Sequence, residues 1–394
     1  MTLKELENQI GIEKDHPEMM EEIYLQKLSD SAPACDLALI DALQEEHELF
    51  GDYHMQVRQV AEQVNGDPLR SLWVKTASSF VLQADDVQAQ QLPLPTADDT
   101  QISRMLPLFA VLPQIPLAVE EYRRRQYPAE EMYRLLRGYR NGLKEGAETY
   151  GYPCYTADYK DWLVYICKVR LFWVDKFRFD IMKAPADALY LQNKETCEIC
   201  PVMMPVTMVS DGKHILGVDG YERAEDTFQV TFREDAEIFY GHGVANCVVS
   251  QNEEVFSKGE WNCILRPGEN CLGMHIGGGA DMTPENVASV IATARDIAAS
   301  RFAEFGITQI YCDSWLLDPQ LGQLAGENTK MAAFMRSFAK HPIRGSGLDA
   351  LGYVFSGDTA DYASLPENTT LQRNMKKHYI NGGYVYFTAG VYCK

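Results

Sequence analysis

The sequence has no long hydrophobic run, and this absence excludes most membrane-embedded proteins. No apolar run approaches the roughly 18 residues that a membrane-spanning helix requires. Residues 1–7 are charged and helical in pattern, so they lack the apolar centre of a signal peptide. We therefore expect a cytoplasmic protein with no membrane partner.

Basic residues are also in short supply. The chain has 36 Lys and Arg against 56 Asp and Glu, which gives a formal net charge of −20. A field of this sign repels a nucleic-acid backbone, so we expect no nucleic-acid partner. A single small anion can still bind where a helix start and a few cations act at close range.

The ten cysteines lack the density and spacing of a secreted disulfide framework. Cys197 and Cys200 form the only C-x-x-C pair, and no second pair follows it. A structural zinc ion normally requires four ligands, so we predict no metal site. Reduced and mostly buried thiols are the expected state.

The pattern of the 394 residues indicates two domains and an α+β fold. Residues 1–150 are predicted to be helical, because apolar residues recur at helical spacing after Asp- and Pro-marked starts. In residues 151–394 apolar and polar residues alternate in short runs, which indicates strands. Helices are expected at 15–28, 37–49, 67–80, 102–112, 116–125 and 128–139. Strands, the earlier ones as an antiparallel meander, are expected at 177–181, 228–232, 237–240, 244–250, 262–265, 272–276, 308–312 and 384–392.

The most informative segment is 271–285, an apolar strand that runs into a three-glycine turn and then a helix. Thr283 suits the N-cap, Pro284 the first helical position and Glu285 the electropositive first turn. Free N–H groups at a helix start form a site for an anion, most often a phosphate. The alternative is a strand-to-helix turn that binds nothing.

The motif and the order of elements resemble the GNAT N-acyltransferase superfamily. Its turn pattern is Arg/Gln-x-x-Gly-x-Gly/Ala, which residues 275–280 fit with Gly278 and Ala280, while His275 replaces the usual first residue. Residues 274–279 together with 312–319 resemble a bacterial acyltransferase family more closely. Its members have a helical N-acyltransferase N-terminal domain and a GNAT-like C-terminal domain, which would be residues 1–150 and 151–394 here.

The resemblance implies a cosubstrate, a coenzyme A thioester such as acetyl-CoA or a longer acyl-CoA. Its pyrophosphate would bind the N–H groups of the turn, and divergence of strand 272–276 from strand 308–312 would open a slot for the pantetheine arm. The small-molecule acceptor would be an amine. The implied cofactor-binding residues are Ile276, Gly277, Gly278, Gly279, Ala280, Asp281, Met282 and Thr283.

Acyl transfer to an amine also requires a general base, for which His275 and Asp313 are the candidates. Each residue also has a purely structural interpretation. His275 would hydrogen-bond the turn, and Asp313 would cap or support the segment that leads to Trp315. Many GNAT enzymes protonate the leaving thiolate with a tyrosine, but residues 318–340 contain none. Tyr311 and Tyr353 are the possible substitutes.

Three functions therefore remain open on the sequence. The first is acyl transfer from a coenzyme A thioester, and the second is a catalytically degenerate GNAT-like protein that binds a ligand or partner. The third is a thiol-dependent hydrolase with Cys312 as nucleophile. The oligomeric state is not determined by the sequence.

Overall fold

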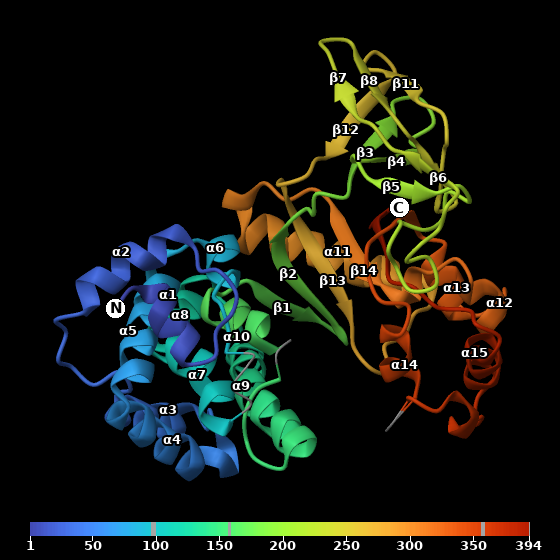
Figure 1. Cartoon of the computed structure of the whole chain (residues 1–394). Helices are drawn as coiled ribbons and strands as arrows, with labels where there is room; N and C mark the ends of the chain where they lie inside the picture. Colours follow the sequence, from blue (N-terminus) through green and yellow to red (C-terminus); the bar gives the residue numbers. More distant parts are fainter. Residues whose placement is uncertain (96–99, 157–158, 356–358, 394) are drawn as a thin grey trace. The chain divides into compact units, whose positions relative to one another are not determined.

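The computed structural model describes residues 1–95, 100–156, 159–355 and 359–393 and divides the chain into two compact units (Figure 1). The units are Met1–Phe172 and Trp173–Lys394. The division lies later than the expected one after residue 150, because helix α10 (Lys160–Cys167) packs against helices α7 and α9 of the first unit. The identity of the first unit as an N-acyltransferase domain stays a prediction.

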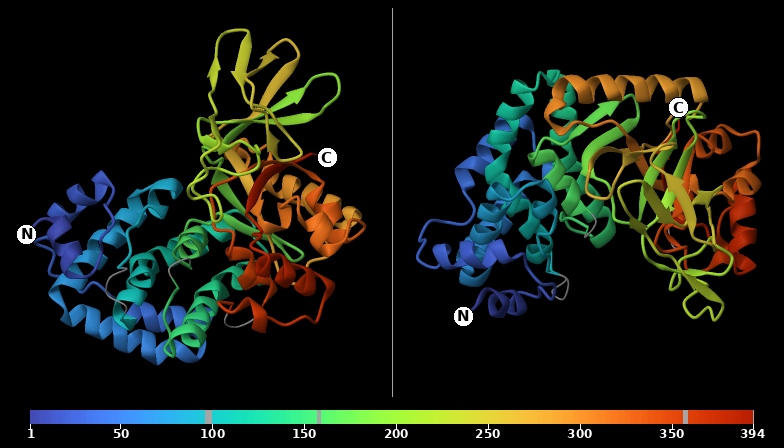
Figure 2. Two further views of the ribbon diagram at one scale, coloured as in Figure 1. Left: turned by 45° about the vertical axis from the view of Figure 1, so that its right-hand side comes forward. Right: turned by 90° about the horizontal axis from the view of Figure 1, so that it is seen from above.

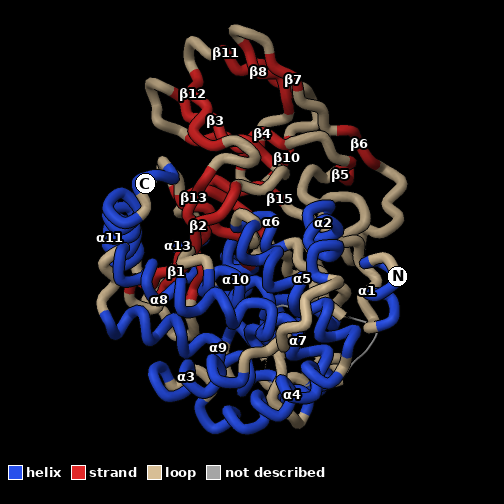
Figure 3. Tube along the Cα trace, turned by 90° about the vertical axis from the view of Figure 1, so that its left-hand side faces the viewer, coloured by secondary structure: helices blue, strands red, loops and turns tan. Residues whose placement is uncertain are grey.

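Helices make up the first unit, apart from the start of β1 (Figure 3). The six expected helices are present, and Asp36 and Asp67 cap two of them through their side chains. Large aromatic side chains such as Trp73, Phe109 and Tyr139 fill the core. Together with α10, the helices of this unit are α1 (Leu3–Gln9), α2 (Glu18–Lys27), α3 (Leu37–His47), η1 (Gly51–Tyr53), α4 (His54–Gly66), α5 (Pro68–Gln83), α6 (Asp86–Gln90), α7 (Gln101–Val111), η2 (Leu112–Gln114), α8 (Ile115–Arg124) and α9 (Ala129–Tyr150).

One stretch of the first unit, Gln101–Arg124, is long and apolar enough to cross a membrane by length and composition, among the described residues. Its apolar run, residues 105–119, is bounded by Arg104 and Glu120 and approaches the length of a membrane span, so the expectation of no such run is wrong here. Of its most apolar window, 72% is buried inside the protein. That burial is typical of helices in the core of a folded unit.

The second unit is built on a six-stranded sheet in the order β1-β2-β13-β14-β16-β15. Strands β13 and β14 pair in parallel, while β13 pairs antiparallel with β2, and β16 pairs antiparallel with both β14 and β15. The sheet strands are β1 (Leu171–Val174), β2 (Phe177–Lys183), β13 (Asn270–Ile276), β14 (Ile310–Ser314), β15 (Phe338–Pro342) and β16 (Thr388–Tyr392). The expected α+β class is confirmed.

Between β2 and β13 the chain forms small separate sheets, so the expected single meander is wrong in this part. Of the strands expected in the meander, those at β2 and β13 lie in the main sheet, where they pair antiparallel with each other. The expected strand 244–250 is broken in two because Asn246 and Cys247 adopt left-handed backbone angles. The strands of this insertion are β3 (Ala188–Asn193), β4 (Ile199–Met203), β5 (Thr207–Val209), β6 (Thr227–Gln229), β7 (Arg233–Glu234), β8 (Ile238–Gly241), β9 (Val244–Ala245), β10 (Val248–Val249), β11 (Glu254–Ser257) and β12 (Trp261–Leu265).

Helix α11 (Pro284–Arg301) follows β13, as the sequence predicts, and is the long orange helix in the right-hand view of Figure 2. Its buried side chains recur at helical spacing and form one face: Val287, Val290, Ile291, Ala294 and Ala298. The other helices of the second unit are shorter than α11; η4 precedes β14, and the rest lie between β14 and β16. They are η4 (Ala303–Phe305), η5 (Trp315–Leu317), α12 (Leu321–Ala325), α13 (Lys330–Met335), α14 (Asp349–Val354), η6 (Tyr362–Ser364) and α15 (Thr370–Ile380).

Candidate functional site

Strands β13 and β14 part from each other near the middle of the sheet. Their residue pairing consists of Leu272 with Ile310 and Gly273 with Tyr311. Beyond this point β13 continues to pair with β2 as far as Ile276, and β14 continues to pair with β16 as far as Ser314. The sheet therefore opens between the two parallel strands at their carboxyl ends, as the sequence analysis expects.

A backbone N–H group faces this opening. The N–H of Leu272 donates to Gln309 on the β14 side, and the N–H of Gly277 donates to Lys176 on the β2 side. Because the N–H groups of a strand alternate between its two edges, the N–H of Ile276 points to the β14 side. It lies beyond the last residue pair between β13 and β14, where a preorganised donor can bind a developing negative charge.

The three glycines of the turn differ in what their missing side chains permit. A Cβ on Gly277 would lie 2.6 Å from the carbonyl oxygen of Lys176, so this glycine allows close backbone packing. Gly279 has a φ of 71°, in the left-handed region that favours glycine. Gly278 differs from both, because a Cβ there would meet no atom within 4 Å and its φ is not positive. Local structure therefore accounts for two of the glycines, while Gly278 leaves open space beside the turn.

A lysine that the sequence analysis does not identify lies over this turn. The Nζ of Lys176 donates a hydrogen bond of 3.0 Å to the carbonyl oxygen of Gly279. Lys176 belongs to the hairpin turn between β1 and β2, far from the glycines in sequence. The contact puts a positive charge beside the exposed backbone of Gly278 and Gly279.

The start of α11 completes the turn. Thr283 is the N-cap residue, as predicted, but its side chain makes no capping hydrogen bond to the helix. Its hydroxyl instead donates to the carboxylate of Asp281, at 3.1 Å. The first-turn amides of α11 therefore have no side-chain cap, and such amides favour a bound anion.

Asp281 brings a negative charge to the same turn, but a cation offsets it. The Nζ of Lys330 lies 3.0 Å from its carboxylate, and this hydrogen bond is the largest factor that lowers the pKa of Asp281. The predicted residues from Ile276 to Thr283 thus form one continuous segment from the last residue of β13 to the N-cap of α11. Their role in binding a cofactor stays a prediction.

His275 pairs with a buried carboxylate. Its Nε2 lies 2.6 Å from the Oδ1 of Asp180, whose side chain is 1% exposed, while the His275 side chain is 33% exposed. Asp180 lies on β2 opposite Gly273, where a Cβ would come within 2.4 Å of the same Oδ1. Gly273 therefore leaves the space in which the carboxylate reaches His275. An Asp–His pair with a solvent-accessible imidazole is suited to general-base chemistry.

Asp313 lies near the end of β14, within the electrostatic influence of this pair. Loss of hydration is the largest factor that raises the pKa of Asp313, although solvent still reaches the side chain; the negative charge of Asp180 raises it further and the charge of His275 lowers it. The structure therefore brings the two predicted bases, His275 and Asp313, into one neighbourhood. The catalytic role of either stays a prediction.

Other candidates from the sequence lie in the core or on helix α14. Cys312 is 1% exposed, and burial raises its pKa well above the usual value, so the thiolate that a nucleophile requires is disfavoured. Tyr311 is 2% exposed with its pKa also raised by burial, whereas Tyr353 is 70% exposed on α14. Within the described ranges no three His, Cys, Asp or Glu side chains gather in the manner of a metal site.

Sequence reasoning misses Asp180 and Lys176. Asp180 alternates with Phe179 and Ile181, which is typical of the solvent face of a strand, yet it is buried. A buried carboxylate requires a partner, but its partner His275 lies on a strand that is distant in sequence. Lys176 carries no local signal, because any polar residue suits a hairpin turn.

Comparisons with known proteins agree with this geometry. Residues 203–392 match the family model of the GNAT-like C-terminal domain. An acyltransferase solved in complex with decanoyl-CoA is similar over 100% of this chain and 99% of its own, with a TM-score of 0.62 and 15% identity. An acyltransferase solved in complex with CoA and 10C-teicoplanin covers the same shares, with a TM-score of 0.58 and 13% identity. At these identities the similarity to the solved structures shows the fold of this chain. A comparison with curated proteins finds no significant match.

Proposed function

We propose that this protein moves an acyl group from a coenzyme A thioester to an amine, since residues 203–392 match the family model of the GNAT-like C-terminal domain. The observation that carries the proposal is the divergence of β13 and β14 beside a glycine turn that is open at Gly278. The structurally similar acyltransferases were solved with decanoyl-CoA, octanoyl-CoA or CoA. These complexes support acyl-CoA thioesters, including medium-chain ones, as donors here.

The acyl-CoA donor would be bound at two places, its pyrophosphate and its thioester carbonyl. Exposed backbone at Gly278 and Gly279 and the uncapped start of α11 suit the negative pyrophosphate. Lys176 adds a cation next to the same backbone. The N–H of Ile276 faces the space where the thioester carbonyl would lie, so it can stabilise the oxyanion that forms during attack.

The transfer itself requires movement of one proton before the carbon–sulfur bond breaks. The amine nitrogen bonds to the thioester carbon, and His275 accepts the proton that the nitrogen loses. The carbon–sulfur bond then breaks, the amide remains, and the coenzyme A thiolate takes a proton from solvent. Asp180 orients the imidazole and stabilises the imidazolium through the 2.6 Å contact.

A second candidate function is a non-catalytic protein with the same fold. The absence of tyrosine from residues 318–340 and the burial of Tyr311 favour it, because of the tyrosine candidates for protonating the thiolate only Tyr353 is then exposed. The buried Asp180 beside a half-exposed His275 favours catalysis.

The test is turnover with octanoyl-CoA or decanoyl-CoA and a panel of primary amines. Thiol release is followed with a disulfide dye, and mass spectrometry detects the amide. The proposal predicts amide and free coenzyme A in equal amounts, and loss of both in His275→Gln. Tight binding of the thioester without turnover on any amine would favour the non-catalytic function.

A further inference from the structure

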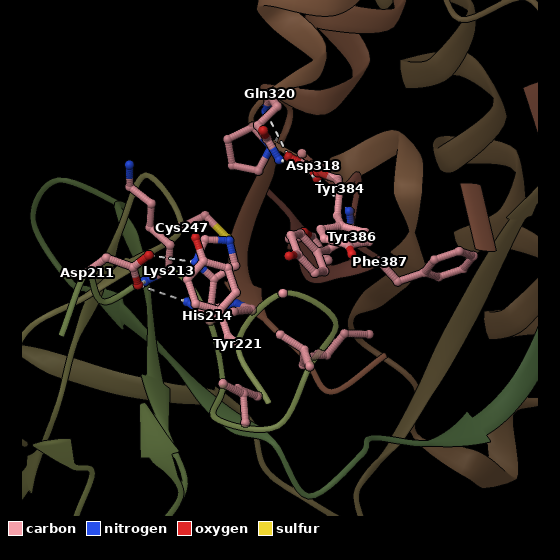
Figure 4. Close-up of a pocket in the computed structure, with 18 of the residues that line it drawn as sticks. Asp211, Lys213, His214, Tyr221, Cys247, Asp318, Gln320, Tyr384, Tyr386 and Phe387 are labelled. Atoms are coloured by element: carbon pink, nitrogen blue, oxygen red, sulfur yellow. Dashed lines mark hydrogen bonds and ion pairs between the residues drawn. The ribbon is translucent and has the colours of Figure 1, made fainter. Parts of the chain in front are cut away.

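The second unit contains a cavity of about 730 Å³ that the proposed acyl-transfer chemistry does not use (Figure 4). One wall follows the carboxyl end of β14 and includes Asp318 and Gln320. Thr388, the first residue of β16, contributes another part and pairs with Ser314 of β14. Residues of loops 211–221, 246–248 and 382–387 form further parts of the lining. None of the lining residues belongs to the turn from Ile276 to Thr283.

Aromatic rings form much of the lining. The ring of His214 stacks on Tyr221, with centroids 4.1 Å apart and an interplanar angle of 16°. The same histidine meets Tyr386 edge-on at 5.0 Å. Tyr384 and Phe387 also line the cavity, as Figure 4 shows. Such surfaces favour flat ligands and, through the negative faces of the rings, cations.

His214 also presents a hydrogen-bond acceptor. Its Nδ1 lies 2.6 Å from the carboxylate Oδ2 of Asp211, drawn as a dashed line in Figure 4. The carboxylate accepts, so Nδ1 carries the proton and Nε2 of the neutral ring is an acceptor. Nε2 has no hydrogen-bond partner among the residues that the structure describes.

A second carboxylate is fixed in the cavity wall. Asp318 is 2% exposed and accepts hydrogen bonds from the backbone N–H and side-chain amide of Gln320 and from the N–H of Tyr386, at 2.8, 3.2 and 2.7 Å. These bonds hold the carboxylate in one orientation. Burial raises the pKa of Asp318, and the hydrogen bonds from Gln320 and Tyr386 act in the opposite direction. An incoming cation would stabilise the charged form in the same way.

We propose that this cavity binds a small molecule that combines an aromatic ring with a protonated amine. Its volume lies within the roughly 300–1,000 Å³ of small-molecule sites. The ring would pack against the tyrosines, and the ammonium group would donate to Nε2 of His214 in the field of Asp211 and Asp318. Lys213 is the lining cation and is exposed, so the carboxylates outnumber it. The proposal concerns binding and does not depend on acyl transfer.

The experiment is isothermal titration of the full chain with tyramine, which has one aromatic ring and one primary amine. Two matched probes separate the contributions, since 3-(4-hydroxyphenyl)propionate replaces the amine with a carboxylate and ethylamine lacks the ring. We expect tyramine to bind at least tenfold more tightly than either. Equal binding of the carboxylate probe, or no binding of tyramine at millimolar concentration, would overturn the proposal.

Variants locate the binding in the cavity. His214→Phe keeps a ring against Tyr221 but removes the acceptor, so tyramine affinity should fall at least tenfold. The matched control is His54→Phe, since His54 of the first unit also stacks on a ring and contacts a carboxylate, Asp41. If His214→Phe does not fold, Gln323→Lys changes an exposed lining residue and adds a repelling cation. Unchanged tyramine affinity in the folded His214→Phe variant, or in Gln323→Lys, would refute the site.

Discussion

Replacement of Asp180 by Asn tests the Asp–His pair most sharply. The two side chains have the same size, so the space opposite Gly273 stays filled and the fold is retained. The change removes the negative charge 2.6 Å from Nε2 of His275. When His275 takes a proton from the amine, the resulting imidazolium loses its charged partner.

The magnitude follows from the burial of the pair. A hydrogen bond to a charged group contributes about 1.5–3 kcal/mol, and about 1.4 kcal/mol corresponds to a tenfold change in rate. We therefore expect kcat of Asp180→Asn to fall between about tenfold and about a hundredfold. KM for octanoyl-CoA should stay within about twofold, because Asp180 does not contact the glycine turn.

The assay is steady-state thiol release with the best amine from the panel, at saturating octanoyl-CoA. Asp41→Asn is the matched control, because Asp41 contacts His54 at 2.8 Å in the first unit. The control should keep the kcat of the unmodified protein. A kcat for Asp180→Asn within twofold of the unmodified protein would refute the assigned role of the pair.

Three further predictions follow from other contacts. Lys176→Met removes the cation beside the turn, so octanoyl-CoA affinity measured by titration at low salt should fall about three- to tenfold, in line with about 1 kcal/mol for an exposed charge; Lys176→Arg should retain it, and equal loss in both variants would contradict a charge effect. Gly273→Ala places a Cβ 2.4 Å from Oδ1 of Asp180, so urea unfolding should show about 1–3 kcal/mol less stability together with loss of turnover; unchanged values for both would show that the carboxylate has room elsewhere. Burial lowers the pKa of His341 from 6.5 to about 3, so between these values the unfolded chain binds a proton that the folded chain does not, and stability is lost as pH falls from 6.5. From pH 7 to pH 4.5 the free energy of unfolding should fall by about 2–3 kcal/mol through this effect. Urea unfolding should show that His341→Gln loses less stability than the unmodified protein over this pH range, by the same amount. An identical loss in the two proteins would exclude the histidine as the cause.

Local patterns were sufficient for the elements that adjoin in sequence. The strand, glycine turn and helix from Cys271 to Glu285 are predicted correctly, because the turn residues, the N-cap and Pro284 each restrict the backbone locally. The α+β class follows from the same kind of pattern. The extent of single elements is less accurate, since α9 continues to Tyr150, beyond the expected end at Tyr139.

The pairing of distant strands could not be predicted in this way. Strand β13 pairs with β2 across the whole insertion from β3 to β12. The alternation of Asp180 with Phe179 is compatible with a solvated strand face, and only the tertiary pairing with β13 shows that a histidine covers the carboxylate. Lys176 was missed for the same reason, because its contact with Gly279 depends on the hairpin lying beside the turn.

The cavity beside β14 was also outside the reach of the sequence. Asp211, His214 and Asp318 come from an inserted loop and from the segment after β14, and no spacing in the chain links them. The Asp211-Gly212 pair fits a simple turn. The contact between His214 and the carboxylate of Asp211 depends on the conformation of this loop, which the sequence does not show.

The measurement that tests the central claim most directly compares octanoyl-CoA with octanoyl-pantetheine by titration, in the unmodified protein and in Gly278→Val. The pantetheine thioester lacks the pyrophosphate, so it should bind the unmodified protein at least a hundredfold more weakly. In Gly278→Val the added Cβ meets no atom within 4 Å, while the side chain blocks the approach of the phosphates, so the two thioesters should bind with similar affinity. Gly66→Val is the matched control, because a Cβ there also meets no atom within 4 Å. If Gly278→Val keeps the full preference for octanoyl-CoA, the turn does not hold the pyrophosphate and the account is wrong.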